Sequence, residues 1–117
     1  MKLDHINLTV TDVQAAKNVL ETYFGMKDLS GDSGRKNFVA LMDSDGLVLT
    51  LMTAGRTKEV KYPETFHIGF NQESKEKVNE MYQRLKDDGF DVQPPEQHHA
   101  WTFYFNAPGG FTIEIMA

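Results

Sequence analysis

The sequence predicts an α+β fold: two repeated βαβββ modules that form a curved mixed sheet around a central cleft. The chain repeats internally, because residues 45–52 resemble residues 109–116 at an offset of 64 positions. The start of each half also matches, since Asp4-His5-Ile6 resembles Phe66-His67-Ile68. A single module has one helix for one face of its sheet, so its other face requires a second module.

The expected elements of the first half follow from its polar and apolar pattern. Residues 3–10 alternate in their later part, which predicts a half-buried strand. Thr11 then caps a helix in a capping box with Gln14, and Gly25 ends this helix. Turns rich in Gly, Asp and Ser separate three further strands, expected over residues 26–30, 36–42 and 47–53.

The second half repeats this order after a linker of charged residues, Gly55 and Pro63. A strand is expected over residues 65–71, followed by a helix that Ser74 caps and Gly89 ends. Three more strands are expected over residues 90–93, 101–106 and 111–116. We therefore expect one domain, 1–117, with a first module at 1–53, a linker at 54–64 and a second module at 65–117.

Composition excludes several function classes. The 117 residues contain no cysteine, which excludes disulfides, thiolate zinc sites and a cysteine nucleophile. The net charge is −5 and no basic stripe is present, so we expect no nucleic-acid partner. No apolar run reaches the roughly 20 residues of a membrane span, and the polar N-terminus does not resemble a signal peptide. A cytoplasmic protein with a small-molecule substrate or ligand is the expectation.

Strand periodicity brings three metal-binding residue types to the polar face of the predicted sheets. His5 lies on this face of the first strand, His67 on that of the fifth and Glu114 on that of the last. Two imidazoles and a carboxylate suit a divalent ion such as Fe, Mn, Zn, Ni or Co, and three protein ligands leave positions for water and substrate. Taken singly, each residue is also explained as a hydrogen-bonded or solvated strand residue.

Four segments carry a resemblance to a known family: Leu3–Asp12, Tyr23–Met26, Phe66–Ile68 and Phe103–Glu114. In this order they resemble the vicinal oxygen chelate superfamily, which contains glyoxalase I, bleomycin-resistance proteins and extradiol dioxygenases. The resemblance covers essentially the whole chain. It implies paired βαβββ modules around a metal-centred cleft, commonly completed in a homodimer.

The resemblance also implies which residues bind the metal. The superfamily's metal positions fall on His5, Thr50, His67 and Glu114. Glyoxalase I enzymes have a carboxylate at the position of Thr50, and a threonine cannot take a proton from carbon at neutral pH. The remaining set of two histidines and one glutamate resembles fosfomycin-resistance enzymes and extradiol dioxygenases.

Further residues are candidates for catalysis and substrate binding. We expect Thr50 to orient metal-bound water and Tyr104 to hydrogen-bond the substrate or an intermediate. Trp101 is either strand core or a stacking surface for a planar ligand, and His98 and His99 either line the mouth of the cleft or belong to a solvated loop. The expected substrate-binding residues are Asn7, Thr9, Phe38, Trp101, His98 and His99.

These residues support three functional hypotheses. The first is a small metal-dependent enzyme that acts on an oxygen-chelating small molecule through the His5, His67 and Glu114 site. The second is a metal-free protein, similar to bleomycin-resistance proteins, that sequesters a small planar compound. The third is a non-catalytic dimerisation or sensing domain.

Overall fold

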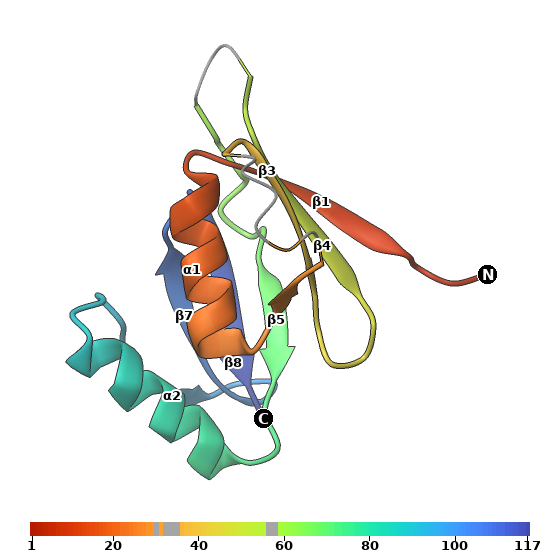
Figure 1. Ribbon diagram of the computed structural model, residues 1–117. Coiled ribbons are helices and arrows are strands. Elements are labelled where there is room, and N and C mark those ends of the chain that lie inside the picture. Colours follow the sequence, from red (N-terminus) through yellow and green to blue (C-terminus); the bar gives the residue numbers. More distant parts are fainter. Residues whose placement is uncertain (30, 32–35, 56–58) are drawn as a thin grey trace. The chain divides into compact units, whose positions relative to one another are not determined.

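A computed structural model describes residues 1–29, 31, 36–55 and 59–117 (Figure 1). The chain divides into two compact units. The first contains Met1–Lys61 and Pro108–Gly110, and the second contains Tyr62–Ala107 and Phe111–Ala117. Each unit is a βαβββ module with one four-stranded mixed sheet, which confirms the predicted α+β class and the repeat. In the described part of the chain, no helix has the length and apolar character that crossing a bilayer requires.

The first unit consists of β1 (His5–Val10), α1 (Val13–Phe24), β2 (Lys27–Asp28), β3 (Phe38–Met42) and β4 (Val48–Thr53). Its strand order is β1-β4-β3-β2, with β1 parallel to β4 and the other pairs antiparallel. Helix α1 packs on β3 and β4. The alternation in β1 buries Leu8 and Val10, while His5 and Asn7 are exposed.

Helix α1 begins one residue later than predicted. Asp12, not Thr11, is the N-cap, and its Oδ1 accepts a hydrogen bond of 3.0 Å from the amide of Ala15. The capping box with Gln14 is therefore wrong, because Gln14 is not the third helical residue after this cap. Thr11 instead donates its backbone N–H to the carbonyl of Gly109 at 2.9 Å. The predicted end is correct: Gly25 has φ 65°, the left-handed conformation that glycine adopts without strain.

The second unit consists of β5 (Ile68–Asn71), α2 (Lys75–Asp87), β6 (Glu96–Gln97), β7 (Trp101–Ala107) and β8 (Phe111–Met116). Its strand order is β5-β8-β7-β6, the same pattern as in the first unit. Helix α2 packs on β7 and β8, and Ser74 caps it as predicted by accepting from the amide of Lys77 at 3.2 Å.

The predicted strand over residues 90–93 is wrong. Its one ladder contact is an isolated bridge between Val92 and Phe105, and the short edge strand lies at Glu96–Gln97 instead. Pro94 and Pro95 stand between the two positions and carry no N–H group, so they cannot continue a hydrogen-bonded ladder. The segment still buries Val92, which explains its strand-like apolar pattern.

The sheet of the second unit has one apolar face and one polar face, as its parity predicts. Phe103, Phe105, Ile113 and Ile115 are buried on the face that α2 covers. On the opposite face, strand register brings Tyr104 and Gly69 to either side of Glu114. This polar face carries the candidate site.

Candidate functional site

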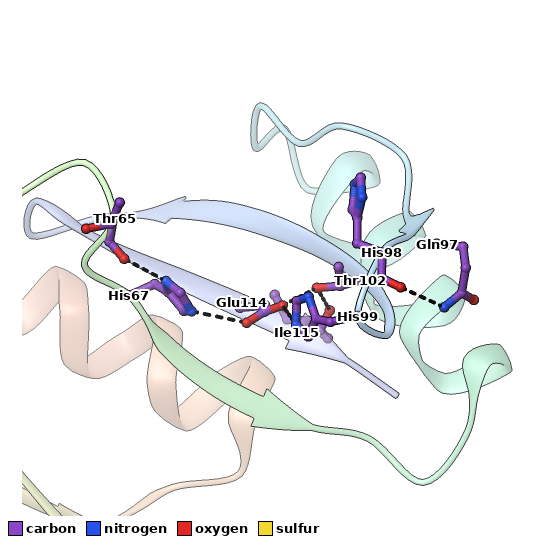
Figure 2. Close-up of polar contacts among 8 residues, drawn as sticks. All are labelled: Thr65, His67, Gln97, His98, His99, Thr102, Glu114 and Ile115. Atoms are coloured by element: carbon purple, nitrogen blue, oxygen red, sulfur yellow. Dashed lines mark hydrogen bonds and ion pairs between the residues drawn. The ribbon is translucent and has the colours of Figure 1, made fainter.

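A buried carboxylate, Glu114 on β8, is the centre of the site (Figure 2). Its side chain is 5% exposed. The hydroxyl of Thr102, a buried residue of β7 on the same face, donates to Glu114 Oε1 at 2.8 Å and lies 3.1 Å from the carbonyl of Ile115. A buried charge requires such partners, because leaving it unpaired costs several kcal/mol.

Two histidines reach this carboxylate from different segments. His67, just before β5, places Nε2 at 3.2 Å from Glu114 Oε2. His99, in the loop between β6 and β7, places Nε2 at 2.8 Å from Glu114 Oε1. Figure 2 shows both rings meeting the same side chain. Residues 67, 99 and 114 are distant in sequence, so the fold alone assembles this group.

Tyr104 is the fourth side chain on Glu114. Its hydroxyl hydrogen-bonds to the carboxylate, and its ring packs edge-on against His67 with centroids 5.5 Å apart. Burial, together with the negative charge of Glu114, raises the pKa of Tyr104 above its ordinary value of 10.0. Tyr104 is therefore a neutral hydrogen-bond donor at neutral pH.

Opposing effects act on the ionisation of Glu114. Burial by itself raises the pKa of this carboxyl, because it disfavours the charged form. The Thr102 hydrogen bond, the charge of His99, the Tyr104 hydrogen bond and the charge of His67 act the other way and prevail. The pKa of Glu114 is consequently lowered, so the side chain is ionised at neutral pH.

The orientation of His67 determines which of its nitrogens can bind an ion. His67 Nδ1 lies 3.0 Å from the carbonyl oxygen of Thr65. A carbonyl can only accept, so Nδ1 carries a hydrogen. Nε2 faces Glu114 Oε2 across 3.2 Å, and because a carboxylate oxygen can only accept, a hydrogen on Nε2 or a cation must lie between these two atoms. Metal-binding histidines commonly have this arrangement, with the second nitrogen donating to a carbonyl or carboxylate.

His5 shows a similar arrangement in the first unit. Its Nδ1 lies 2.9 Å from Asp4 Oδ2, which leaves Nε2 as the acceptor nitrogen, although both side chains are largely exposed. On the same face, Thr50 donates its hydroxyl to Asn7 Oδ1 at 2.7 Å. Thr50 stands 64 positions before Glu114, so it occupies the repeat position of the buried carboxylate.

The described residues contain no group of three or more His, Cys, Asp or Glu side chains that could hold a metal ion. The second unit brings His67 and Glu114 together as a pair. His5 belongs to the first unit, so the three-ligand set stays a prediction.

The other predicted binding residues have different surroundings. The Trp101 indole nitrogen donates to Asn79 Oδ1 on α2 at 2.8 Å, and Lys75 Nζ lies 5.8 Å from the ring centroid. These contacts favour the strand-core alternative for Trp101. His98 Nε2 lies 3.1 Å from Glu96 Oε2, and Figure 2 shows this ring pointing away from the Glu114 group.

Thr9 and Phe38 lie on the sheet of the first unit. Both pair with Met52 of β4, Thr9 from β1 and Phe38 from β3. They therefore share the strand face of Thr50, as their parity predicts.

A pocket of about 360 Å³ lies beside the Glu114 group in the second unit. It shares Thr102 and Tyr104 with that group. Among the described residues, its polar lining contains carboxylates, amides and one imidazole but no Lys or Arg: Asp91, Gln93, Glu96, His98, Thr102, Tyr104 and Asn106. Its volume is in the range of small-molecule sites, about 300–1,000 Å³.

Sequence reasoning missed the roles of Thr102 and His99 as partners of Glu114. Thr102 has the same strand parity as Tyr104, so pairing β7 against β8 by their shared turn could have identified it. His99 lies in a loop, where no periodicity fixes the direction of a side chain.

Comparison with known proteins identifies the family. The family model described as the Glyoxalase/Bleomycin resistance protein/Dioxygenase superfamily matches residues 2–115. The chain belongs to this superfamily. This confirms the resemblance carried by its four sequence segments.

Several members of the superfamily are similar to the chain. A structure described as a possible glyoxalase from Bacillus cereus is 55% identical, with a TM-score of 0.90 over 100% of this chain and 99% of that one. A fosfomycin resistance protein, FosX, from Listeria monocytogenes, solved with Mn(II) and dihydroxypropylphosphonic acid, is 24% identical, with a TM-score of 0.78 over 99% and 91% of the chains. The FosX likeness shows the shared fold.

A probable trivalent organoarsenical cleaving enzyme from Bacillus subtilis is 32% identical over 90 residues, which make up 77% of this chain. The match covers 58% of the length of that relative. These relatives of the superfamily carry enzyme names.

Proposed function

We propose that this protein is a metal-dependent enzyme of the glyoxalase superfamily that acts on a small molecule with oxygen donors. His67 Nε2 and Glu114 Oε2 are the proposed ligands from the second unit, and His5 Nε2 is the proposed third ligand. The set of two imidazoles and one carboxylate suits Fe, Mn, Zn, Ni or Co. The Mn(II) in the FosX structure is consistent with a divalent ion on this fold.

One observation carries the proposal: His67 Nε2 lies 3.2 Å from Glu114 Oε2, while Nδ1 of the same ring is held by a backbone carbonyl. The Thr65 carbonyl fixes the ring so that Nε2 points at the carboxylate. His5 has its Nδ1 held by Asp4, which leaves the same nitrogen available. The residues therefore fit a divalent ion by their donor chemistry.

The chain's own residues account for binding and orientation of a substrate. A bound ion would act as a Lewis acid on a substrate oxygen. Tyr104, neutral at neutral pH, could donate to a substrate oxygen on which negative charge develops by turning its one hydroxyl hydrogen away from Glu114. Thr50 is proposed to orient bound water through its hydroxyl, which donates to Asn7.

The pocket beside Glu114 favours a neutral, hydroxylated or cationic substrate over an anionic one. Asp91 and Glu96 line it together with amide side chains, and among its described lining residues only His98 can carry a positive charge. A phosphonate would meet two carboxylates there, with His98, which already contacts Glu96, as its cationic partner. An organoarsenical is also disfavoured, because trivalent arsenic is a soft centre that prefers thiolates and the 117 residues contain no cysteine.

The test is the metal content of protein purified without chelator or affinity tag. We expect about one divalent ion per site in the wild type, and its loss in His67→Ala and Glu114→Gln. His98→Ala is the matched control, because this imidazole contacts Glu96 instead of Glu114. Metal-free wild type that also fails to bind Mn(II), Fe(II) or Zn(II) in titrations would refute the proposal.

A second candidate is a metal-free binding protein for a small planar compound. The preformed pocket favours it, because aromatic side chains, Phe103 and Tyr104, are part of the lining. Binding of an aromatic compound that is unchanged by EDTA and by Glu114→Gln would support it.

We also propose a homodimer, in which His5 of one copy meets the second-module ligands of the other. Sedimentation velocity tests this arrangement, and a strictly monomeric protein would exclude it.

A further inference from the structure

We propose that His99 and Thr102 are positioning residues that hold one oxygen of Glu114, so that the ion binds through the other oxygen alone. The inference rests on the proposed metal-dependent function and assigns the environment of Glu114 within it. His99 and Thr102 would act through Glu114 and would not bind the ion themselves.

Two donors occupy Glu114 Oε1. A carboxylate oxygen has two lone pairs. Oε1 accepts from the Thr102 hydroxyl at 2.8 Å and lies 2.8 Å from His99 Nε2. Two donors at this distance use both lone pairs, so Oε1 has no electron pair left for a cation.

The contact with Glu114 fixes a hydrogen on His99. Because the carboxylate can only accept, His99 Nε2 carries a hydrogen in this contact. That nitrogen therefore has no lone pair for a metal. His67 differs because its other ring nitrogen is also held: Nδ1 lies 3.0 Å from the Thr65 carbonyl, so the ring keeps one hydrogen there when an ion takes the place of a hydrogen on Nε2. The two imidazoles on Glu114 thus differ in their proposed roles: His67 Nε2 would bind the ion, and His99 Nε2 keeps its hydrogen on Oε1.

Glu114 Oε2 is the oxygen that remains for a cation. It faces His67 Nε2 at 3.2 Å. On its other side, even an added Cβ at Gly69 would come no closer than 3.9 Å, an ordinary contact. A cation at Glu114 therefore binds through Oε2.

Binding through Oε2 alone would leave a coordination position of the ion open for the substrate. A carboxylate that binds with one oxygen occupies one coordination position, and a carboxylate that binds with both occupies two. Holding Oε1 thus leaves one more position for a substrate oxygen. Burial favours this arrangement, because Thr102 is only 2% exposed and cannot exchange its bond for water.

The experiment measures the affinity of the chelator-stripped protein for Mn(II) by calorimetric titration. Outer-shell partners of metal ligands typically contribute 10- to 100-fold in affinity. We expect losses of about that size in His99→Ala and in Thr102→Val. Thr102→Ser retains the hydroxyl and His99→Gln retains an N–H donor, so both should recover most of the affinity. His98→Ala is the neighbouring-histidine control and should bind as the wild type does.

A second readout separates positioning from a merely structural role. The visible absorption of Co(II) bound to the protein depends on coordination number. We expect weaker absorption in His99→Ala than in the wild type, because a released Oε1 adds a ligand. If Thr102→Val does not fold, the His99 pair still decides the outcome, since that side chain is 55% exposed.

The outcomes separate this inference from the proposed function. If wild type binds no divalent ion, both fail. If wild type binds Mn(II) and loses it with Glu114→Gln, while His99→Ala and Thr102→Val match the wild type in affinity and spectrum, only the positioning inference is overturned.

Discussion

Replacing Thr102 by valine should destabilise the metal-free protein, and the penalty should depend on pH. Valine has nearly the shape of threonine but lacks the hydroxyl. The substitution therefore removes the 2.8 Å hydrogen bond to Glu114 Oε1 without opening a cavity. The site is buried, so water cannot replace the lost donor.

The expected magnitude follows from the charge on the acceptor. A hydrogen bond to an ionised group contributes about 1.5–3 kcal/mol to stability. With a urea slope of about 2 kcal/mol per molar, the unfolding midpoint at pH 7 should fall by roughly 1 M. Thr112→Val is the matched control: its hydroxyl makes a 3.4 Å contact to Asn106 on the same pair of strands. We expect a change within about 0.5 kcal/mol there.

The pH dependence follows from the lowered pKa of Glu114. A lowered folded-state pKa means that folding favours the carboxylate, so the resulting stability is present above the ordinary value of 4.5. This stability is lost as the pH falls through the lower folded value. Loss of the Thr102 donor raises the pKa of folded Glu114. The difference between wild type and variant should therefore be largest at neutral pH and should shrink below about pH 4.5.

Urea denaturation followed by circular dichroism at pH 7 and at pH 3.5, with EDTA present, measures this difference. An equal penalty at both pH values would show that packing, not the charged hydrogen bond, causes the loss. A penalty at pH 7 no larger than that of the Thr112 control would refute the assigned role of the hydroxyl.

Five further substitutions test the local structure by urea denaturation, and one of them is also tested by Mn(II) affinity. Asp12→Ala should cost about 1 kcal/mol of stability by removing the helix cap, and Thr11→Ala should cost clearly less; the reverse order would contradict the observed cap. Gly25→Ala should cost about 1 kcal/mol because φ is 65° there, whereas Gly69→Ala should be nearly neutral because its Cβ makes only an ordinary contact. Trp101→Phe should lower stability yet leave Mn(II) affinity unchanged, and a loss of Mn(II) affinity would restore a binding role for this side chain.

The period of two in β-strands explains why much of the fold and the core of the site were predictable. Parity placed Glu114 on the polar face of the last strand, and the observed register agrees: Tyr104 lies beside Glu114, while Ile113 is buried on the opposite face. The match between His5 and His67 followed from the repeat. These predictions succeed because the strand positions that alternate toward the core are also the apolar positions that burial favours.

The errors arise where local signals were ambiguous. Thr11 and Asp12 are both good caps, and a long-range bond from the Thr11 amide to Gly109 decided between them. The apolar pattern at Val92 reflects burial through one isolated bridge, not a strand. The contact of His99 with Glu114 depends on how a loop returns to the sheet, and no local pattern encodes that path.

His5 and His67 also differ in whether a mutation can remove the contact that orients the ring. Asp4 orients His5 through a side chain, so a single codon change can remove that support. Thr65 orients His67 through its backbone carbonyl, which is present whatever residue occupies the position. The two halves of a duplicated chain therefore have unequal genetic robustness. Substitutions that accumulate over time can remove the Asp4 contact that orients His5. The Thr65 carbonyl that orients His67 is kept for as long as the chain folds.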